Sequence, residues 1–510
     1  MMKIKEKITK ISFARMLVTF TACLTMMGLT GCQNELDNIS GKVIEQVSDL
    51  EGASIGVQIG TTGDIYVSDY EGDEAGTKIE RYNKGPDAIQ ALKLGKIDCV
   101  IIDEQPAIQF VNKNSNIRII EEEFTLEEYA LVIAKENDEL LQKVNVALTK
   151  ILNDGTVDNI VKNYIGTDEE KGKFPYETKA VDRNNGVLKM ATNAEFPPYE
   201  YHENNKIVGI DVDIMRAICD ELGMELQIED MSFDSIIAAV SSGKVDVGAA
   251  GFTVTEDRKK SVNFSETYTT SKQVIIVRDG DMASTSSFTD KLYDNFVKDN
   301  RYQYILKGLA NTLIITVFAV VIGIVLGFLI AIVRTSHDRN GGLNILNALC
   351  KIYLTVMRGT PVMIQLLIIY YVILSSVTNK ILVAAIAFGL NSAAYVAEIV
   401  RSGIMSVEIG QFEAGRSLGL DYKTTMQLIV LPQAVKNILP ALLNEFISLL
   451  KETSISGYIG LMDLTKGGDI IRSNTYEAFL PLIAVAIIYL VLVMLLSFGV
   501  NKLEKKLRNE

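Results

Sequence analysis

The sequence predicts two units of different fold class, an α/β domain followed by an all-α domain of membrane-spanning helices. The charge balance changes along the chain: residues 33–300 carry roughly 50 acids against 27 bases, and residues 301–510 roughly 13 against 18. In the first part short β-branched runs alternate with helical patterns, whereas the second part holds long apolar runs. An acidic soluble part argues against nucleic-acid binding, which needs a basic surface.

The first 32 residues have the pattern of a targeting segment. A basic start precedes an apolar stretch, residues 16–30, that is short for a bilayer-spanning helix. The stretch ends in Leu29-Thr30-Gly31-Cys32, which resembles a bacterial lipobox. The resemblance implies a lipoprotein signal peptide at 1–32, cleavage before Cys32 and lipidation of its thiol, with a linker at 33–45. The acidic domain would then lie outside the bacterial cell membrane.

Five stretches of the second part are candidate membrane spans: 309–333, 352–376, 381–404, 434–455 and 479–500. The first and the last are nearly continuous apolar sequence, long enough to cross roughly 30 Å of hydrocarbon. If the first span starts outside, the Lys and Arg residues of the first and third loops and of the tail are cytoplasmic, as the positive-inside rule requires. The sequence therefore predicts a multi-pass domain with a cytoplasmic C-terminus.

The loop between the third and fourth spans carries a spaced motif: Glu413-Ala414-Gly415, then Gly419, then Pro432. Glycine and proline at these offsets suit a short helix, a sharp turn and a second helix. The motif resembles the cytoplasmic coupling loop of ATP-binding-cassette (ABC) importer permeases, where a short helix docks into a groove on a separate ATPase. The resemblance implies that Glu413, Ala414, Gly415, Gly419 and Pro432 contact that ATPase.

A second motif, Arg358-Gly359-Thr360-Pro361 followed by Gln365, resembles the signature of polar-amino-acid permeases. With the coupling motif, it identifies residues 304–505 as a five-span permease domain of the histidine/glutamine permease family. The sequence has no G-x-x-x-x-G-K-(S/T) loop, so we expect ATP hydrolysis on a separate chain. A single five-span unit rarely encloses a pathway, so we also expect a homodimer of permease domains.

Two segments of the α/β part carry chemistry. One is a strand that runs into the turn Gly60-Thr61-Thr62-Gly63. The other begins at Phe196-Pro197-Pro198-Tyr199-Glu200 and ends at Gly251-Phe252-Thr253-Val254-Thr255-Glu256-Asp257-Arg258. The second segment resembles the first lobe of the family 3 extracellular amino-acid-binding proteins, and the first segment resembles their second lobe. The resemblance implies a two-lobed, periplasmic-binding-protein-like domain of type II.

The order of the two lobes is reversed relative to that family. The second lobe (46–128) comes first, followed by 129–166, a linker (167–187), the rest of the first lobe (188–278) and a linker (279–303). We interpret residues 46–278 as one circularly permuted substrate-binding domain; the alternative is two truncated domains in tandem. Permutation predicts that the start near 42–46 and the exit near 276–279 lie side by side, as the cut ends of one hinge crossing.

The resemblance also assigns residues to an amino-acid ligand. Arg258 would pair with its α-carboxylate, because a guanidinium fork matches two oxygens, and Asp103 with its α-ammonium. Phe196 and Phe233 would sandwich its stem. The other assigned residues are Gly251, Thr253, Thr61 and Thr62 around the carboxylate, and Asn193, Gln58 and Ile102 around the side chain.

Plainer roles stay open for several of these residues. Arg258 could be a solvated charge, Phe233 a core residue and Asp103 a helix cap. Asn193 stands where binders of basic or glutamine-like ligands have an acid, which puts a lysine- or arginine-specific pocket in doubt without excluding it.

The sequence thus predicts a non-enzymatic subunit of an ABC importer, which captures a polar amino acid outside the cell and forms the pathway for its ATP-driven uptake. We expect no cofactor, no metal site and no catalytic residue on this chain. One alternative is a ligand-gated channel or receptor built on the same binding domain. Another is an enzyme on the two-lobed fold, although the only histidines are His202 and His337 and no nucleophile–base pair stands out. The sequence does not name the amino acid.

Overall fold

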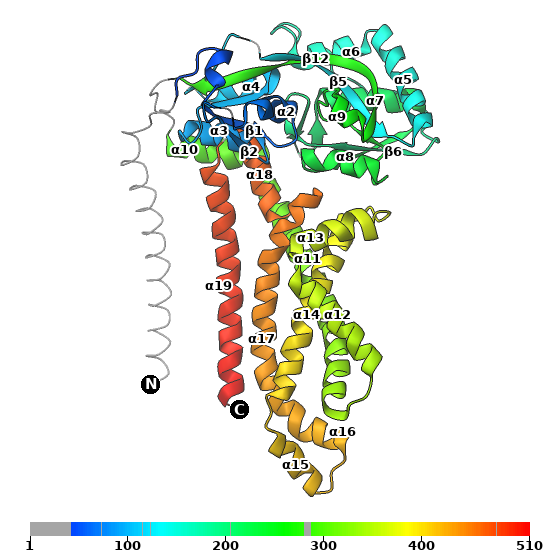
Figure 1. The fold of residues 1–510 in the computed structure, drawn as a ribbon, viewed down its shortest axis with the longest axis vertical. Coiled ribbons are helices and arrows are strands. Elements are labelled where there is room, and N and C mark those ends of the chain that lie inside the picture. The colour runs from blue at the N-terminus through cyan, green and yellow to red at the C-terminus, as the bar shows by residue number, and fades with distance from the viewer. Residues whose placement is uncertain are drawn as a thin grey trace.

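A two-lobed α/β domain sits at one end of a bundle of long helices (Figure 1). The computed structural model describes residues 42–509 apart from 73, 115, 123, 205, 280–286 and 476. The predicted signal peptide and its Cys32 lie outside the described residues. The α/β domain and the helical domain follow each other as expected, so the predicted fold class is confirmed.

The lobe that comes first in the chain is a parallel sheet in which each strand leads into a helix. β1 (Ser54–Gln58) lies between β2 (Lys78–Tyr82) and β3 (Cys99–Asp103) and is parallel to both. β3 is buried along its whole length, as expected of an apolar strand covered on both faces. The helices that follow are α2 (Thr62–Val67), α3 (Gly85–Lys93) and α4 (Glu104–Lys113). Their N-termini lie at the carboxyl edge of the sheet, where ligands of open α/β sheets bind.

The other lobe repeats this arrangement with β6 (Val187–Thr192), which is parallel to both β10 (Glu225–Asp230) and β11 (Val247–Gly248). An antiparallel group of three short strands extends from it: β7 (Glu195–Phe196), β8 (Glu200–Glu203) and β9 (Lys206–Val208). Its helices are α5 (Asp138–Asn153), α6 (Thr156–Ile165), α7 (Ile210–Leu222), α8 (Phe233–Ser241) and the single turn α9 (Glu256–Lys259). The apolar faces of α5, α6 and α7 share one core with β6.

Two long antiparallel strands join the lobes, β5 (Thr125–Ala134) and β12 (Val262–Arg278). Within the described residues they make one nine-stranded sheet, in the order β10-β6-β11-β5-β12-β3-β1-β2, with β4 (Ile117–Ile119) on β12. Residues 273–277 of β12 pair with β3, and residues 276–278 with β4. The end of β12 therefore belongs to the second lobe. The first lobe, which was expected to end at 278, ends earlier within β12, because this strand continues from the first lobe into the second.

The start of the described chain packs beside the exit from β12. Ile44 and Leu50 share one buried core with Ile275 and Val277. Both crossings between the lobes, β5 and β12, are nevertheless continuous. The expectation that the chain is cut at a hinge crossing is thus wrong: start and exit meet inside the second lobe.

Four helical segments of the described residues are long and apolar enough to cross a membrane. They contain α11 (Tyr302–Asn340), α14 (Lys380–Met405), α17 (Leu431–Glu452) and α19 (Phe479–Asn509). α14 is the central helix, since 72% of its apolar window is buried, against 22% for α11 and 17% for α19. Small residues allow α14 and α11 to pack closely, because a Cβ on Gly389 of α14 would lie only 2.7 Å from Ile322 of α11.

The span expected at 352–376 is not one straight helix. α12 (Asn344–Gly359) and α13 (Val362–Ile368), with the turn Ile369–Ile373, meet at an angle of 111°. Pro361 has no N–H to continue the helix and disfavours the helical conformation at Thr360, which is extended. Gln365 Nε2 stabilises the break between α12 and α13 by donating hydrogen bonds to the carbonyls of Met357 (2.8 Å) and Thr360 (3.0 Å). By length and composition, the described residues therefore contain four candidate spans, or five if the bent pair counts as one.

Two further segments differ from expectation. Part of the predicted linker 279–303 is helical: α10 (Phe288–Leu292) leads through the turns Tyr293–Val297 and Lys298–Asn300 into α11. A helix that the sequence did not suggest, α18 (Leu464–Thr475), lies between α17 and α19, beside the α/β domain (Figure 1).

Candidate functional site

The predicted ligand residues come from turns that meet between the two lobes. They lie on the turn from β1 into α2, at the ends of β3, β6 and β11, and at the start of α8. Eight of the eleven line one cavity: Gln58, Thr61, Thr62, Asp103, Asn193, Phe196, Phe233 and Gly251. Thr253 and Arg258 are buried beside them, Thr253 within hydrogen-bond distance of Thr62 and Arg258 bonded to the Gly60 carbonyl of the same turn. Ile102 is buried in β3 and is not part of the cavity lining.

The lobes are closed on each other. The cavity between them measures about 20 Å³, which is room for one water and not for an amino acid. Across the cleft, Gln58 Nε2 donates to Asn193 Oδ1 at 3.4 Å, and the hydroxyl oxygens of Thr62 and Thr253 lie 3.2 Å apart. An amino acid can enter only after the lobes separate, and its atoms then replace these contacts.

Arg258 is a buried charge rather than a solvated one. Its guanidinium donates to the carbonyl of Thr253 at 2.9 Å and, in the opposite lobe, to the carbonyl of Gly60 at 2.8 Å. It lies over the stacked rings of Phe233 and Phe252, 5.6 Å and 5.3 Å from their centroids. Burial lowers the pKa of Arg258, and the nearby Glu127 and Asp103 oppose that shift. The fork predicted for a ligand carboxylate thus bonds to backbone carbonyls of both lobes.

Asp103 does not cap the helix it precedes, since its side chain makes no bond to the first turn of α4. Its carboxylate instead accepts a hydrogen bond from the Tyr129 hydroxyl. Burial, and then the nearby Glu127, raise the pKa of Asp103 to about 7. A ligand ammonium beside Asp103 would stabilise the ionised form, which is the pairing that the resemblance implies.

Glu127, on β5, is an acid of the cleft that the sequence did not single out. Its Oε2 accepts hydrogen bonds from Thr253 Oγ1 (2.6 Å), Thr62 Oγ1 (3.0 Å) and Gln273 Nε2 (3.3 Å). In the closed cleft it thus occupies the Thr253 hydroxyl, which the resemblance gives to the ligand carboxylate, together with the hydroxyl of Thr62. Glu127 stands next to another glutamate in a crossing strand, and no sequence pattern distinguishes the two.

Glu200, on β8, is a second acid that the sequence did not assign, although it stands within a quoted motif. It lines the cavity at 1% exposure, and its carboxyl group forms a side-chain hydrogen bond with that of Asp211. Burial and the neighbouring Asp211 raise the pKa of Glu200 well above its usual range. Asp211 has partners of its own, the Tyr268 hydroxyl and the Gly251 N–H, both at 2.8 Å.

The coupling residues lie at the end of the bundle farthest from the α/β domain (Figure 1). Glu413, Ala414 and Gly415 are on the short helix α15 (Ile409–Ser417), which turns at Gly419 into α16 (Tyr422–Thr425). Gly419 has φ = +81°, a conformation that side chains other than glycine's disfavour. Pro432 stands in the first turn of α17, where its missing N–H costs no helical bond.

Charged contacts dock the α/β domain onto the helical bundle through α18. Lys466 is 7% exposed, and its Nζ lies 2.8 Å from Glu195 Oε1 and 3.2 Å from Asp230 Oδ2 of the first lobe. Burial alone would raise the pKa of Glu195, but Lys466 and then Lys84 lower it to about 2.

The other lobe is held by the same helix. Asp469 pairs with Lys84 at 3.1 Å, and Arg472 pairs with Asp87. α18 therefore touches both lobes in their closed arrangement.

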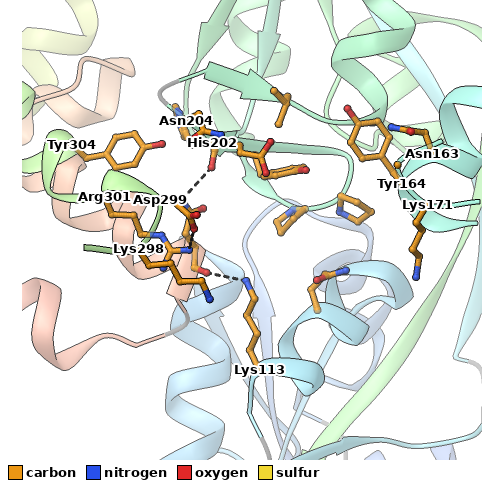
Figure 2. Close-up of a pocket in the computed structure, with 18 residues that line it drawn as sticks. Lys113, Asn163, Tyr164, Lys171, His202, Asn204, Lys298, Asp299, Arg301 and Tyr304 are labelled. Carbon is orange, nitrogen blue, oxygen red and sulfur yellow. Dashed lines mark hydrogen bonds and ion pairs between the residues drawn. The ribbon is translucent and has the colours of Figure 1, made fainter. Parts of the chain in front are cut away.

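A second, wider cavity of about 650 Å³ lies between the α/β domain and the start of α11 (Figure 2). In Figure 2, Lys113 reaches from α4 toward the turn that carries Lys298 and Asp299. Burial, followed by Arg301 and Lys298, lowers the pKa of Lys113 to about 8. The lining of this cavity includes none of the predicted ligand residues. The cavity between the lobes is therefore the candidate ligand site.

Comparisons with known proteins agree with both halves of this architecture. Residues 188–480 match the family described as bacterial extracellular solute-binding proteins, family 3. The chain is 42% identical over 207 residues to the putative glutamine transport system permease protein GlnP of Rickettsia bellii (strain RML369-C), covering 40% of this chain and 93% of that protein. It is 40% identical over 209 residues to the arginine transport system permease protein ArtQ of Bacillus subtilis (strain 168), with the same two coverages.

A crystal structure of an amino acid ABC transporter with histidines is 38% identical, covers 44% of this chain and 99% of that one, and has a TM-score of 0.39. The docked two-lobed domain and the apolar helices together define a transport protein of the membrane. The chain belongs to the family 3 bacterial extracellular solute-binding proteins and to the amino-acid ABC transporter permeases.

Proposed function

We propose that this chain captures a polar amino acid in the cleft between its lobes and passes it into a pathway formed by its helical half, with uptake driven by ATP hydrolysis on a separate chain. One observation carries the proposal: the residues that would bind an amino acid converge on one cavity, in a domain already docked on the permease helices. The names of the relatives, which mention glutamine and arginine, favour a polar amino acid.

The docking supports direct delivery. Close approach at Gly460, between α17 and α18, leaves no room for a side chain, because a Cβ there would lie 1.5 Å from the Asp230 carbonyl oxygen. Lys380, at the start of α14, pairs with Glu229 of the first lobe at 2.7 Å. A ligand released when the lobes separate would therefore leave beside the outer ends of the membrane helices.

The far end of the bundle suits a soluble partner. Glu413 and Ala414 are exposed, and the apolar side chains of Ile409 and Leu418 are 74% and 79% exposed at the two ends of α15. An apolar surface of this kind, outside the membrane, favours a protein contact. We place the ATPase here, on the cytoplasmic side, with the α/β domain outside the cell.

Three finer points belong to the same proposal. The chain is cleaved before Cys32 and the Cys32 thiol is lipidated, which anchors the start of the α/β domain at the outer surface. Two copies of the helical half form the pathway, because one bundle of four or five spans encloses little space. The α/β domain is a circular permutation, since its lobes add up to one complete two-lobed domain in which Ile44 packs beside Val277. The chain itself needs no cofactor.

The test is to purify the full chain in lipid nanodiscs from cells that also express its ATPase, and to measure ATP hydrolysis with each of the twenty amino acids. We expect the ATPase to stay bound and hydrolysis to rise with one polar amino acid or a small group of them. A ligand-gated channel would instead purify without an ATPase, and an enzyme would convert the amino acid.

A further inference from the structure

A lysine of the first lobe inserts into the helical half, apart from the contacts made by α18. Lys244 stands in the loop between α8 and β11 and is 7% exposed. Its Nζ donates to the carbonyl oxygens of Val377 (3.0 Å), Tyr370 (3.4 Å) and Leu374 (3.4 Å). It also lies 4.0 Å from the centroid of the Tyr370 ring. Because lysine is rarely buried without partners, these groups together form a socket for its ammonium.

The socket is the end of α13 that lies nearest the α/β domain (Figure 1). Its carbonyls belong to the turn Ile369–Ile373 and to the residues that follow it. Carbonyls at the C-terminal end of a helix have no partner within the helix, and the helix dipole favours a cation beside them. Lys244 thus caps, from another domain, the helix pair that bends at Pro361.

The same turn connects two hydrophobic cores. Tyr371 packs against the first-lobe core that contains Ile236 and Phe252, and also against a core of the bundle shared by α13, α14 and α17. Its neighbour Tyr370 is buried in the core of the bundle, and the two rings meet edge to face with their centroids 4.8 Å apart. A shift of the first lobe against this turn therefore acts on the packing of the central helix α14.

α8 connects the ligand cavity to this turn. Its first residue, Phe233, lines the cavity and stacks on Phe252, with the ring centroids 4.7 Å apart. Lys244 follows shortly after its last residue, Ser241. In Figure 1, α8 lies on the side of the first lobe that faces the helical bundle. A single short helix thus has one end at the ligand cavity and the other at the permease.

We propose that Lys244 is the positioning residue that holds α8 on the turn Ile369–Ile373, and that this contact reports occupancy of the cleft to the permease helices. The proposal rests on the proposed function and adds to it a route from binding to ATP hydrolysis. Rigid helices and packed side chains of this kind carry coupling between distant sites. The ion pairs of α18 dock the two lobes, whereas Lys244 contacts the end of the bent helix pair.

The experiment is ATP hydrolysis by the full chain and its ATPase in nanodiscs, titrated with the amino acid that, among the twenty, stimulates hydrolysis most. Lys244→Met should lower the maximal stimulation by about two- to thirtyfold, the range that corresponds to typical coupling between sites. The half-maximal concentration should stay at the wild-type value, because Lys244 does not line the ligand cavity. Hydrogen exchange should become faster in the turn Ile369–Ile373 and stay unchanged in α18 and β7.

Tyr371→Leu tests the same contact without changing Lys244, and it keeps the position apolar. It should also lower the maximal stimulation, and the double variant should lose little more, because both changes interrupt one contact. Lys143→Met is the matched control, since Lys143 is an exposed lysine of the same lobe, and it should match the unmodified chain.

Wild-type maximal stimulation in either variant overturns the proposal. Faster exchange of α18 and β7 in Lys244→Met also overturns it, since Lys244 would then serve docking alone. If Lys244→Met does not fold, Tyr371→Leu decides. If no amino acid stimulates hydrolysis by the unmodified chain, the proposed function fails instead.

Discussion

Lys466→Met removes the charge that joins α18 to the first lobe while keeping an unbranched side chain only one atom shorter than that of lysine. Glu195 then retains Lys84 at 2.9 Å, and Asp230 retains His202 at 3.3 Å and the Ala194 N–H at 3.1 Å. Both acids stay buried with less charge against them, and truncating one partner of such a group costs about 2–5 kcal/mol. Since about 1.4 kcal/mol is tenfold, the docked-to-undocked ratio should fall by roughly 30-fold to several thousand-fold.

Hydrogen exchange measures this ratio in the full chain. Amides of α18 and of β7 should exchange faster in Lys466→Met, and uptake should fall, whereas the dissociation constant of the amino acid should stay near the wild-type value. Lys143→Met is the control, because Lys143 forms an exposed pair with Glu139 that contributes little. Wild-type exchange and wild-type uptake in Lys466→Met would refute the argument that this contact holds the two halves together.

Three further predictions concern the cleft and the far end of the bundle. Arg258→Ala should weaken amino-acid binding by about 2–5 kcal/mol, and Arg258→Lys should also bind poorly because it lacks the planar fork; calorimetry with near-normal affinity in either variant would place the carboxylate elsewhere. Gly419→Val should strain a turn at φ = +81° and abolish uptake, with ligand binding intact. Gly410→Ala on the same loop is the control and should transport normally, because a Cβ at Gly410 meets nothing within 4 Å. Burial raises the pKa of Asp103 to about 7 and that of Asp211 to about 6. Because the folded protein holds these protons more tightly than the unfolded chain does, the stability they contribute is fully present below about pH 4 and is lost as pH rises through 6 to 7. Thermal unfolding between pH 5 and 8 should show the α/β domain losing stability with rising pH, with a shallower slope in Asp103→Asn; an unchanged slope in that variant would argue against this source.

Residues on strand-to-helix turns could be predicted from the sequence, because the topology of the sheet fixes where they meet. Thr61 and Thr62 follow β1, Asp103 ends β3 and Asn193 follows β6, so the carboxyl edges of the two half-sheets bring them to one cavity. Glu127 and Glu200 could not be found in this way. Glu127 lies in the long strand β5 and Glu200 in the short strand β8, and only the packing of a second lobe shows that these acids are buried.

In the helical half, too, the sequence predicted some elements and missed others. Among the long apolar runs, the expected span 381–404 matches α14 closely, whereas α11 and α19 extend well beyond the expected spans 309–333 and 479–500. α18 has no such run, and it contains Lys466, Asp469 and Arg472 because it packs against the charged lobes rather than against lipid. Pro361 was visible in the sequence, yet only the backbone shows that it bends the second span by 111° instead of capping it. The end of the first lobe was misplaced for a related reason, since β12 continues from one lobe into the other as a single 17-residue strand.

The most direct test of the account is amino-acid accumulation in proteoliposomes that contain the full chain and its ATPase, with ATP supplied on the side of α15. We expect the amino acid bound by the cleft to accumulate against its gradient, only with ATP and only with the ATPase present. Arg258→Ala should stop accumulation by removing ligand binding, and Gly419→Val by preventing coupling to the ATPase. Amino-acid or ion flux that runs down its gradient without ATP would contradict an importer and indicate a ligand-gated channel.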